Sequence, residues 1–259
     1  MVATGLLLGA SLSLLNGLAF GFVGRVVSKR TLQSEEARAN MAFVLWWYTL
    51  GGLTVVGSGF SFAAAFGYTD LALHVTLLHV ALLLLFVGLW GLAYYLAYLF
   101  TGDKRWFSIL AWFYGAFYFW IVYLVVKARP NEVIINRYSV EVGYEIELAD
   151  TSPYLGFVGL LLLLPQIIGA LAYFSLLFRV KAPMQRYRIG MVAGTFLIWF
   201  GSSLLAGVLK LRDTTDWYGP VSQIISVAAA FMILLAFRPP RSIVVALEAR
   251  EAKQSGGIV

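Results

Sequence analysis

Seven long runs of apolar residues, each 20 to 30 residues in length, constrain the fold of this chain more than any other feature. A bilayer core about 30 Å thick is crossed by a helix of about 20 apolar residues. Every acidic or basic residue falls between the runs or at their ends. The sequence therefore predicts seven membrane-spanning helices, at residues 4–24, 41–66, 71–100, 106–126, 154–178, 189–209 and 218–237.

This pattern predicts an all-α membrane protein with one domain, a seven-transmembrane-helix bundle over residues 1–238. The first run lacks a preceding basic segment, so we interpret it as a span rather than a cleaved signal. Residues 239–259 are expected to form a short cytoplasmic tail. Pro239 and Pro240 should end the seventh helix, and residues 242–253 can form an amphipathic helix lying on the membrane.

The basic residues predict the orientation of the bundle. The segments after the first, third and fifth runs, together with the tail, hold 14 of the 19 lysines and arginines. The opposite side holds the other five and eight of the 13 acidic residues. Because basic residues concentrate in cytoplasmic loops, the N-terminus is predicted to lie outside and the C-terminus in the cytoplasm. The net charge of +6 thus reflects topology, and no nucleic-acid partner is expected.

Residues 129–152 form the one long polar segment, between the fourth and fifth runs. Apolar and polar residues alternate over 140–148, and this period of two predicts a strand with one covered face. Residues 133–138 are rich in strand-forming side chains and are the expected partner. Because so small a pair is marginal in water, we expect an extracellular β-hairpin across the outer helix ends. It would serve as a structural cap or as a lid over a site.

The composition of the spans excludes several chemistries. The chain has no cysteine, so it has no disulfide or thiolate site. The only titratable side chains inside a span, apart from tyrosines, are His74 and His79, which lie roughly 140° apart on one helix. Two histidines without a buried carboxylate cannot form a catalytic zinc site. We therefore predict a non-enzymatic protein with no metal and no cofactor.

Several spans contribute polar or aromatic groups at a similar depth in the outer half of the bundle. They are candidates for a mostly apolar small-molecule site, or they are interhelical hydrogen-bonding groups. We expect His74 to be interfacial. His79 is expected either to bond a neighbouring helix or to contact a ligand that enters from outside. The predicted ligand-binding residues are His79, Trp120, Tyr123, Gln166, Ser202, Ser203 and Gln223.

Glycine pairs at a spacing of four are expected to permit close packing within the bundle. They are Gly5 with Gly9, Gly17 with Gly21, and Gly190 with Gly194.

The segment from 41 to 241 resembles the seven-helix membrane sensor domain at the N-terminus of some prokaryotic histidine kinases. The resemblance rests on the turn LFTGDKRW, the outer segment after the fourth run, the basic connection FRVKAPMQRYRIG and the closing FRPP. It implies a multi-pass protein of the prokaryotic inner membrane that passes a signal through its seventh span to an output domain. Because 22 residues follow Phe237 here, we expect the output partner to be a separate chain.

These features favour a receptor-like protein that binds an apolar or amphipathic small molecule within the lipid bilayer and acts through a partner. Two alternatives stay open. The chain could be an accessory subunit of a larger membrane complex, or a transporter of a neutral solute.

Overall fold

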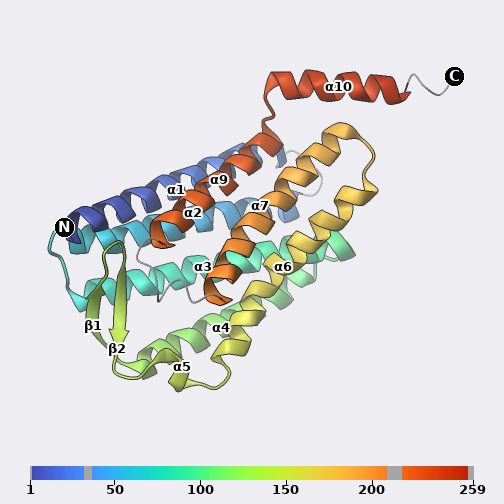
Figure 1. Cartoon of the computed structure of the whole chain (residues 1–259). Helices are drawn as coiled ribbons and strands as arrows, with labels where there is room; N and C mark the ends of the chain where they lie inside the picture. The colour runs from blue at the N-terminus through green and yellow to red at the C-terminus, as the bar shows by residue number, and fades with distance from the viewer. Residues whose placement is uncertain (1, 32–36, 209–217, 256–259) are drawn as a thin grey trace.

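A computed structural model describes residues 2–31, 37–208 and 218–255 of the chain, with the side chains of some helical residues left out (Figure 1). Most of these residues are helical, and a single pair of strands interrupts the helices within the described ranges. The elements are α1 (Val2–Thr31), α2 (Ala37–Ala65), α3 (Leu71–Thr101), α4 (Trp106–Ala128), β1 (Pro130–Ile135), β2 (Val140–Tyr144), α5 (Leu148–Thr151), α6 (Leu155–Arg179), α7 (Pro183–Val208), α9 (Tyr218–Phe237) and α10 (Arg241–Ser255).

Five of these helices, α1, α2, α3, α4 and α9, are long and apolar enough to cross a membrane, judged on the described residues. This finding confirms the expectation of a multi-pass helical membrane protein. The predicted bounds of the seventh run coincide with α9, and those of the third differ from α3 by one residue. The helices α6 and α7 have 25 and 26 residues and pack beside the others.

The helices form a closed arrangement rather than an open row. Each of α1 to α4 packs against the next, and α9 returns to lie between α1 and α7. The remaining helix, α6, contacts both α7 and α3. Figure 1 shows the hairpin at the end of the bundle where α1 begins and α10 near the opposite end. The first and last candidate spans are therefore neighbours.

Aromatic rings fill the core of the half of the bundle predicted to face the cytoplasm. The ring of Phe20 on α1 stacks on Trp47 of α2 at 5.9 Å between centroids. The ring of Phe43 on α2 stacks on Tyr95 of α3 at 4.6 Å. The hydroxyls of Tyr95 and Tyr173 are 3.1 Å apart and join α3 to α6. These contacts link four helices without any charged group.

Small residues set the close approach of α1 and α2. A side chain on Gly51 would meet the Gly17 carbonyl oxygen at 2.9 Å and the Gly21 nitrogen at 3.0 Å. Only a residue without a Cβ permits this spacing at Gly51 and at Gly17, so the expected role in close packing is confirmed for Gly17, whereas a side chain on Gly21 would meet nothing within 4 Å.

Local capping explains where α3 begins and ends. The Asp70 carboxylate accepts a hydrogen bond of 3.3 Å from the Ala72 N–H, which satisfies one free donor of the first turn. At the other end Gly102 has φ +68°, a left-handed conformation that glycine adopts without strain, and its N–H bonds the Tyr98 carbonyl oxygen.

The predicted strand over 140–148 is too long. The strands pair antiparallel from Ile135 with Val140 back to Pro130 with Tyr144, and β2 ends there. Beyond the strand, the Glu145 N–H still bonds the Arg129 carbonyl oxygen at 3.0 Å and the Ile146 N–H bonds that of Ala128 at 3.2 Å, where the partner segment is the end of α4. The predicted partner over 133–138 is likewise shifted, because residues 136–139 form the turn. The segment after β2 holds the short helix α5, which the alternation did not predict.

The tail helix lies against the start of α7 rather than apart from the bundle. Pro239 and Pro240 separate α9 from α10, as expected, and α10 is longer than the predicted 242–253. The carboxylate of Glu251 accepts a hydrogen bond of 3.3 Å from the Met184 N–H. This contact caps the N-terminal end of α7 with a negative charge, an arrangement that stabilises a helix start.

Candidate functional site

The turn of the hairpin rests on the first helix. A side chain on Gly5 would overlap the Arg137 carbonyl oxygen, and one on Gly9 would overlap that of Tyr138. The expected close packing at this glycine pair is therefore made with the hairpin backbone instead of a second helix. Because β1 and β2 also contact α3, and β2 contacts α2, the hairpin bridges three helices.

The base of the hairpin carries an exposed ion pair and a shielded tyrosine. The Arg129 guanidinium lies 3.4 Å from the Glu145 carboxylate, and both side chains are more than half exposed. Such a pair contributes little to stability. On β2, burial raises the pKa of the Tyr144 hydroxyl above its ordinary value of 10.0. The side of the hairpin near the bundle is therefore neutral.

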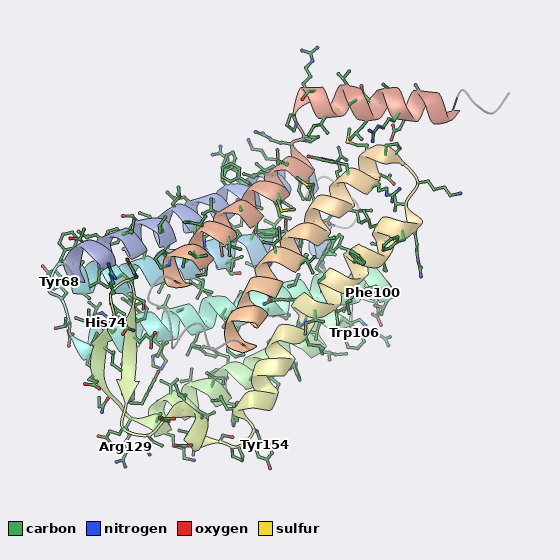
Figure 2. The ribbon with its side chains drawn as sticks, in the orientation of Figure 1. Tyr68, His74, Phe100, Trp106, Arg129 and Tyr154 are labelled. Carbon is green, nitrogen blue, oxygen red and sulfur yellow. The ribbon has the colours of Figure 1, made fainter. Side chains whose placement is uncertain are left out.

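The side chain of His74 is the most enclosed polar group at this end of the bundle. It lies on the first turn of α3 beside the hairpin strands (Figure 2) and is 0% exposed. Its Nδ1 is 2.9 Å from the Asp70 carbonyl oxygen, so Nδ1 carries the proton. The Phe60 ring of α2 meets the imidazole edge to face at 5.6 Å. In the neutral imidazole Nε2 is then an acceptor, and it has no hydrogen-bond partner among the described residues.

A seam of neutral polar side chains runs through the outer half between α1, α2 and α9. The Ser13 hydroxyl donates a hydrogen bond of 2.8 Å to the Thr54 carbonyl oxygen. The Asn16 Nδ2 donates one of 2.7 Å to the Gln223 Oε1. The Asn16 Oδ1 is buried and has no partner in the described part of the chain. The seam joins the first helix to both of its neighbours.

Of the predicted site residues, Gln223 accepts the interhelical hydrogen bond from Asn16. It therefore acts as a hydrogen-bonding group between helices. The Nδ1 of His79 lies 2.7 Å from the Val75 carbonyl oxygen of its own helix, so the expected bond to a neighbouring helix is not formed by this nitrogen. The Trp120 ring packs edge to face on Phe117 of the same helix at 6.3 Å.

Burial separates the remaining predicted residues. Tyr123 is 61% exposed, whereas Gln166 on α6 is 8% exposed and lies beside the helix-internal Pro165. The backbones of Ser202 and Ser203 belong to α7, but their side chains lie outside the described residues. No hydrogen bond or ring contact joins two of the predicted side chains that the structure describes. Their assembly into one site stays a prediction.

Sequence reasoning passed over Asn16 and placed His74 at the interface. A lone amide inside an apolar run was a usable signal for Asn16, because such a group needs a partner in the bilayer. His74 lies beside the Phe60 ring of α2 and beside hairpin strands that contact α3 (Figure 2), and no local pattern reveals these neighbours.

The described structure thus has one buried imidazole at the outer end, with the Phe60 ring beside it, and one buried amide oxygen on Asn16 midway along α1. Among the described residues, no group of three or more His, Asp or Glu side chains is placed to hold a metal ion. In the comparisons with known proteins, no protein-family model and no curated protein matches the chain.

Proposed function

We propose that this protein is a non-enzymatic, receptor-like protein of the prokaryotic inner membrane, with seven spans and its N-terminus outside. It binds an apolar or amphipathic small molecule at its outer end and acts through a separate partner on the cytoplasmic side. One observation carries the proposal: the hairpin turn rests on α1, and α1 is hydrogen-bonded to α9, which leads into α10. An event at the hairpin thus has a contiguous route to the opposite end.

The proposed seven spans add α6 and α7 to the five candidates above. Both have the length needed to cross a bilayer. Their inclusion places the 14 basic residues on the side of α10 and leaves five on the side of the hairpin. This asymmetry supports the proposed orientation.

Recognition in this proposal centres on His74. A ligand hydroxyl or N–H would donate to the free Nε2, while the Phe60 ring and the hairpin would enclose its apolar part. A buried acceptor left without a partner costs about 1–3 kcal/mol, so satisfying it favours binding. The residues predicted from the sequence, His79 and Trp120 among them, would line the deeper part of the same outer half.

Native mass spectrometry of the purified protein in mild detergent tests ligand binding. The wild type is expected to retain a small molecule of constant mass. His74→Asn should lose it, because asparagine keeps the bond to the Asp70 carbonyl but removes the Nε2 acceptor. Thr76→Val is the matched control on the exposed face of the same helix. A wild type that carries no small molecule, or a His74→Asn variant that keeps one, contradicts the proposal.

The route to the cytoplasmic side is tested with a spin label on α10. Val245 is 57% exposed, and Val245→Cys provides a unique attachment site because the chain has no cysteine. In this background Gly9→Val should displace the hairpin and change the mobility of the label. Gly21→Ala, on the same helix where a side chain meets nothing within 4 Å, should not. Identical spectra from both variants would exclude the route.

A second candidate function is that of an accessory subunit of a membrane complex. It is favoured by the face of α4 that points away from the bundle. Trp112 is 82% and Phe119 72% exposed, and α4 contacts α3 but few other elements. Such a face suits either lipid or another subunit. Purification from native membranes decides between them: a stoichiometric second chain supports the subunit role, and a single chain with a bound small molecule supports the receptor.

A further inference from the structure

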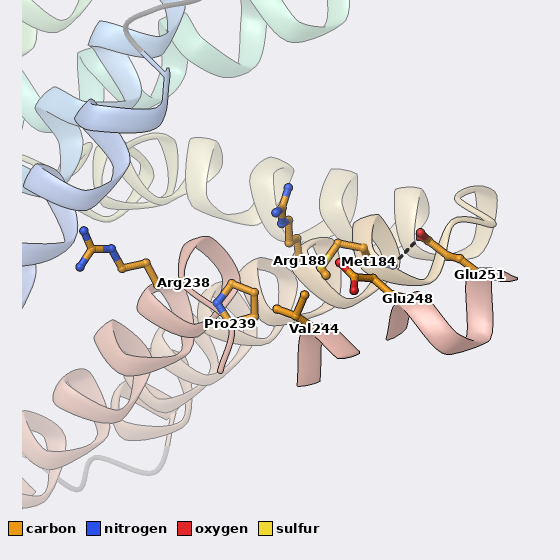
Figure 3. A pocket seen from close by; sticks show the side chains of 7 residues that line it. All are labelled: Met184, Arg188, Arg238, Pro239, Val244, Glu248 and Glu251. Carbon is orange, nitrogen blue, oxygen red and sulfur yellow. Dashed lines mark hydrogen bonds between the residues drawn. The ribbon is translucent and has the colours of Figure 1, made fainter. Parts of the chain in front are cut away.

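A groove of about 550 Å³ lies at the end of the bundle opposite the hairpin, between the start of α7, the end of α9 and α10. Figure 3 shows its side chains in a row, with Arg238 at one end, Arg188 and Glu248 in the middle and Glu251 at the other end. Its lining consists of Met184, Arg188, Arg238, Pro239, Val244, Glu248 and Glu251.

The groove is held open by the docking of α10. The Glu251 carboxylate bonds the Met184 N–H and ties α10 to the start of α7. The rigid segment at Pro239 turns the chain out of α9 and sets the distance between the two helices. The groove is therefore a product of tertiary structure, which the sequence of any one helix does not reveal.

Charges of both signs line the groove without neutralising each other. The side chains of Arg188 and Arg238 form no ion pair or hydrogen bond with another of the described residues, and the same holds for the Glu248 carboxylate. Guanidinium groups are suited to phosphate oxygens because they donate several hydrogen bonds in a fixed plane. Carboxylates are suited to a primary ammonium group.

We infer that this groove binds the headgroup of a phospholipid that carries both a phosphate and a primary ammonium, as in phosphatidylethanolamine. The phosphate accepts hydrogen bonds from Arg188 in the middle of the groove, Arg238 adds positive charge at its end, and the ammonium donates to Glu248 (Figure 3). A choline headgroup fits less well because its quaternary nitrogen has no N–H to donate. A purely anionic headgroup leaves Glu248 unpaired beside a negative charge.

An exposed apolar face of α9 leads from this groove toward the middle of the bilayer. Ile224 and Phe231 are 57% and 58% exposed. Ile224, Phe231 and Arg238 follow one another at intervals of seven residues. Seven residues are close to two helical turns, so these side chains lie on one face of α9. An acyl chain can pack along this face while the headgroup occupies the groove, which favours a lipid over a free phosphate compound.

The test is native mass spectrometry of the full chain in detergent with equimolar phosphatidylethanolamine, phosphatidylglycerol and phosphatidylcholine of identical acyl chains. The wild type is expected to retain the ethanolamine lipid over the choline lipid by about tenfold, the effect of one charge-assisted hydrogen bond. Arg188→Gln and Arg238→Gln should weaken retention of all three lipids. Glu248→Gln should abolish the preference for ethanolamine and leave total retention nearly unchanged.

Arg105→Gln is the matched control. Arg105 lies just before α4, in a loop that is also predicted to face the cytoplasm but is not part of the groove. This variant should retain the three lipids as the wild type does. If it loses as much lipid as Arg238→Gln, the loss is due to net charge and not to the groove. Tighter retention of phosphatidylglycerol than of phosphatidylethanolamine would overturn the assignment of the headgroup. If an equal concentration of free phosphoethanolamine displaces the lipid, the groove binds the headgroup alone, and the proposal that its ligand is a lipid is wrong. Unfolding temperatures of all variants, measured alongside, verify that α10 stays docked.

Discussion

The carbonyl oxygen of Tyr138 occupies the space that a side chain on Gly9 would need, so the turn of the hairpin and the first helix are in direct backbone contact. Gly9→Ala should therefore lift the turn from α1 and destabilise the protein by about 1–3 kcal/mol, the usual cost of overpacking. Thermal unfolding in detergent measures this change. Gly21→Ala serves as the control and should be neutral or slightly stabilising, because alanine favours a helix more than glycine does. Equal unfolding temperatures for the two variants would show that the turn is not seated on α1.

The two faces of β2 should differ in their tolerance of charge. Val142 pairs with Val133 and is half-buried, whereas Glu141 is exposed. Val142→Glu is expected to cost about 1–3 kcal/mol of unfolding free energy, since it places a charge on the covered face. Glu141→Val should change the unfolding temperature little. Limited proteolysis of the hairpin gives an independent measurement, and equal cleavage rates would contradict the assignment of faces.

The hydrogen bond between Asn16 and Gln223 should show coupling in a double-mutant cycle. Asn16→Leu leaves the Gln223 amide without its partner, and Gln223→Leu does the same to Asn16. Each single change should destabilise the protein, and the double change should cost less than the sum of both. Coupling energies of about 0.6 kcal/mol, and up to about 1.7, are typical within membranes. Strictly additive effects would place the two side chains apart.

Cysteine accessibility in whole cells should report the orientation. Because the native chain has no cysteine, Tyr154→Cys and Val245→Cys each create one thiol, at positions 67% and 57% exposed. A membrane-impermeant maleimide should label Tyr154→Cys in intact cells. It should label Val245→Cys only after the cells are opened. The reverse pattern would place the hairpin in the cytoplasm.

The deeper part of the outer site is tested by His79→Leu. Leucine suits the bilayer interior, so the fold should persist while retention of the bound small molecule weakens. If this variant retains the small molecule and His74→Asn does not, the site is confined to the layer beneath the hairpin. If neither change affects retention, the histidines serve packing alone.

The existence of the five candidate spans could be predicted because it follows from the length of the apolar runs. The bounds of α9 follow from where apolar residues start and stop, and those of α3 from Asp70 and Gly102 at its ends. The end of α1 was predicted too early, at 24, because a helix can continue past the bilayer on long basic side chains such as Lys29.

The hairpin register and the site depended on contacts distant in the chain. Alternation continues past Tyr144, yet β2 ends there, and the next two residues bond the last residues of α4 instead of a strand. The hairpin that lies beside His74 (Figure 2) is 56 or more residues later in the chain. The pairing of Asn16 with Gln223 spans 207 residues. Local periodicity contains no information about such partners.

The contact between the first and last candidate spans imposes an order on biosynthesis. At about 5–20 residues per second, Gln223 is synthesised about 10 to 40 seconds after Asn16. During that interval α1 carries a polar amide whose partner in its own chain does not yet exist. The nascent bundle therefore stays open along one side until α9 arrives, and the insertion machinery must shelter α1 in the meantime. A ribosome that stalls before α9 leaves the side of α1 that packs against α9 uncovered.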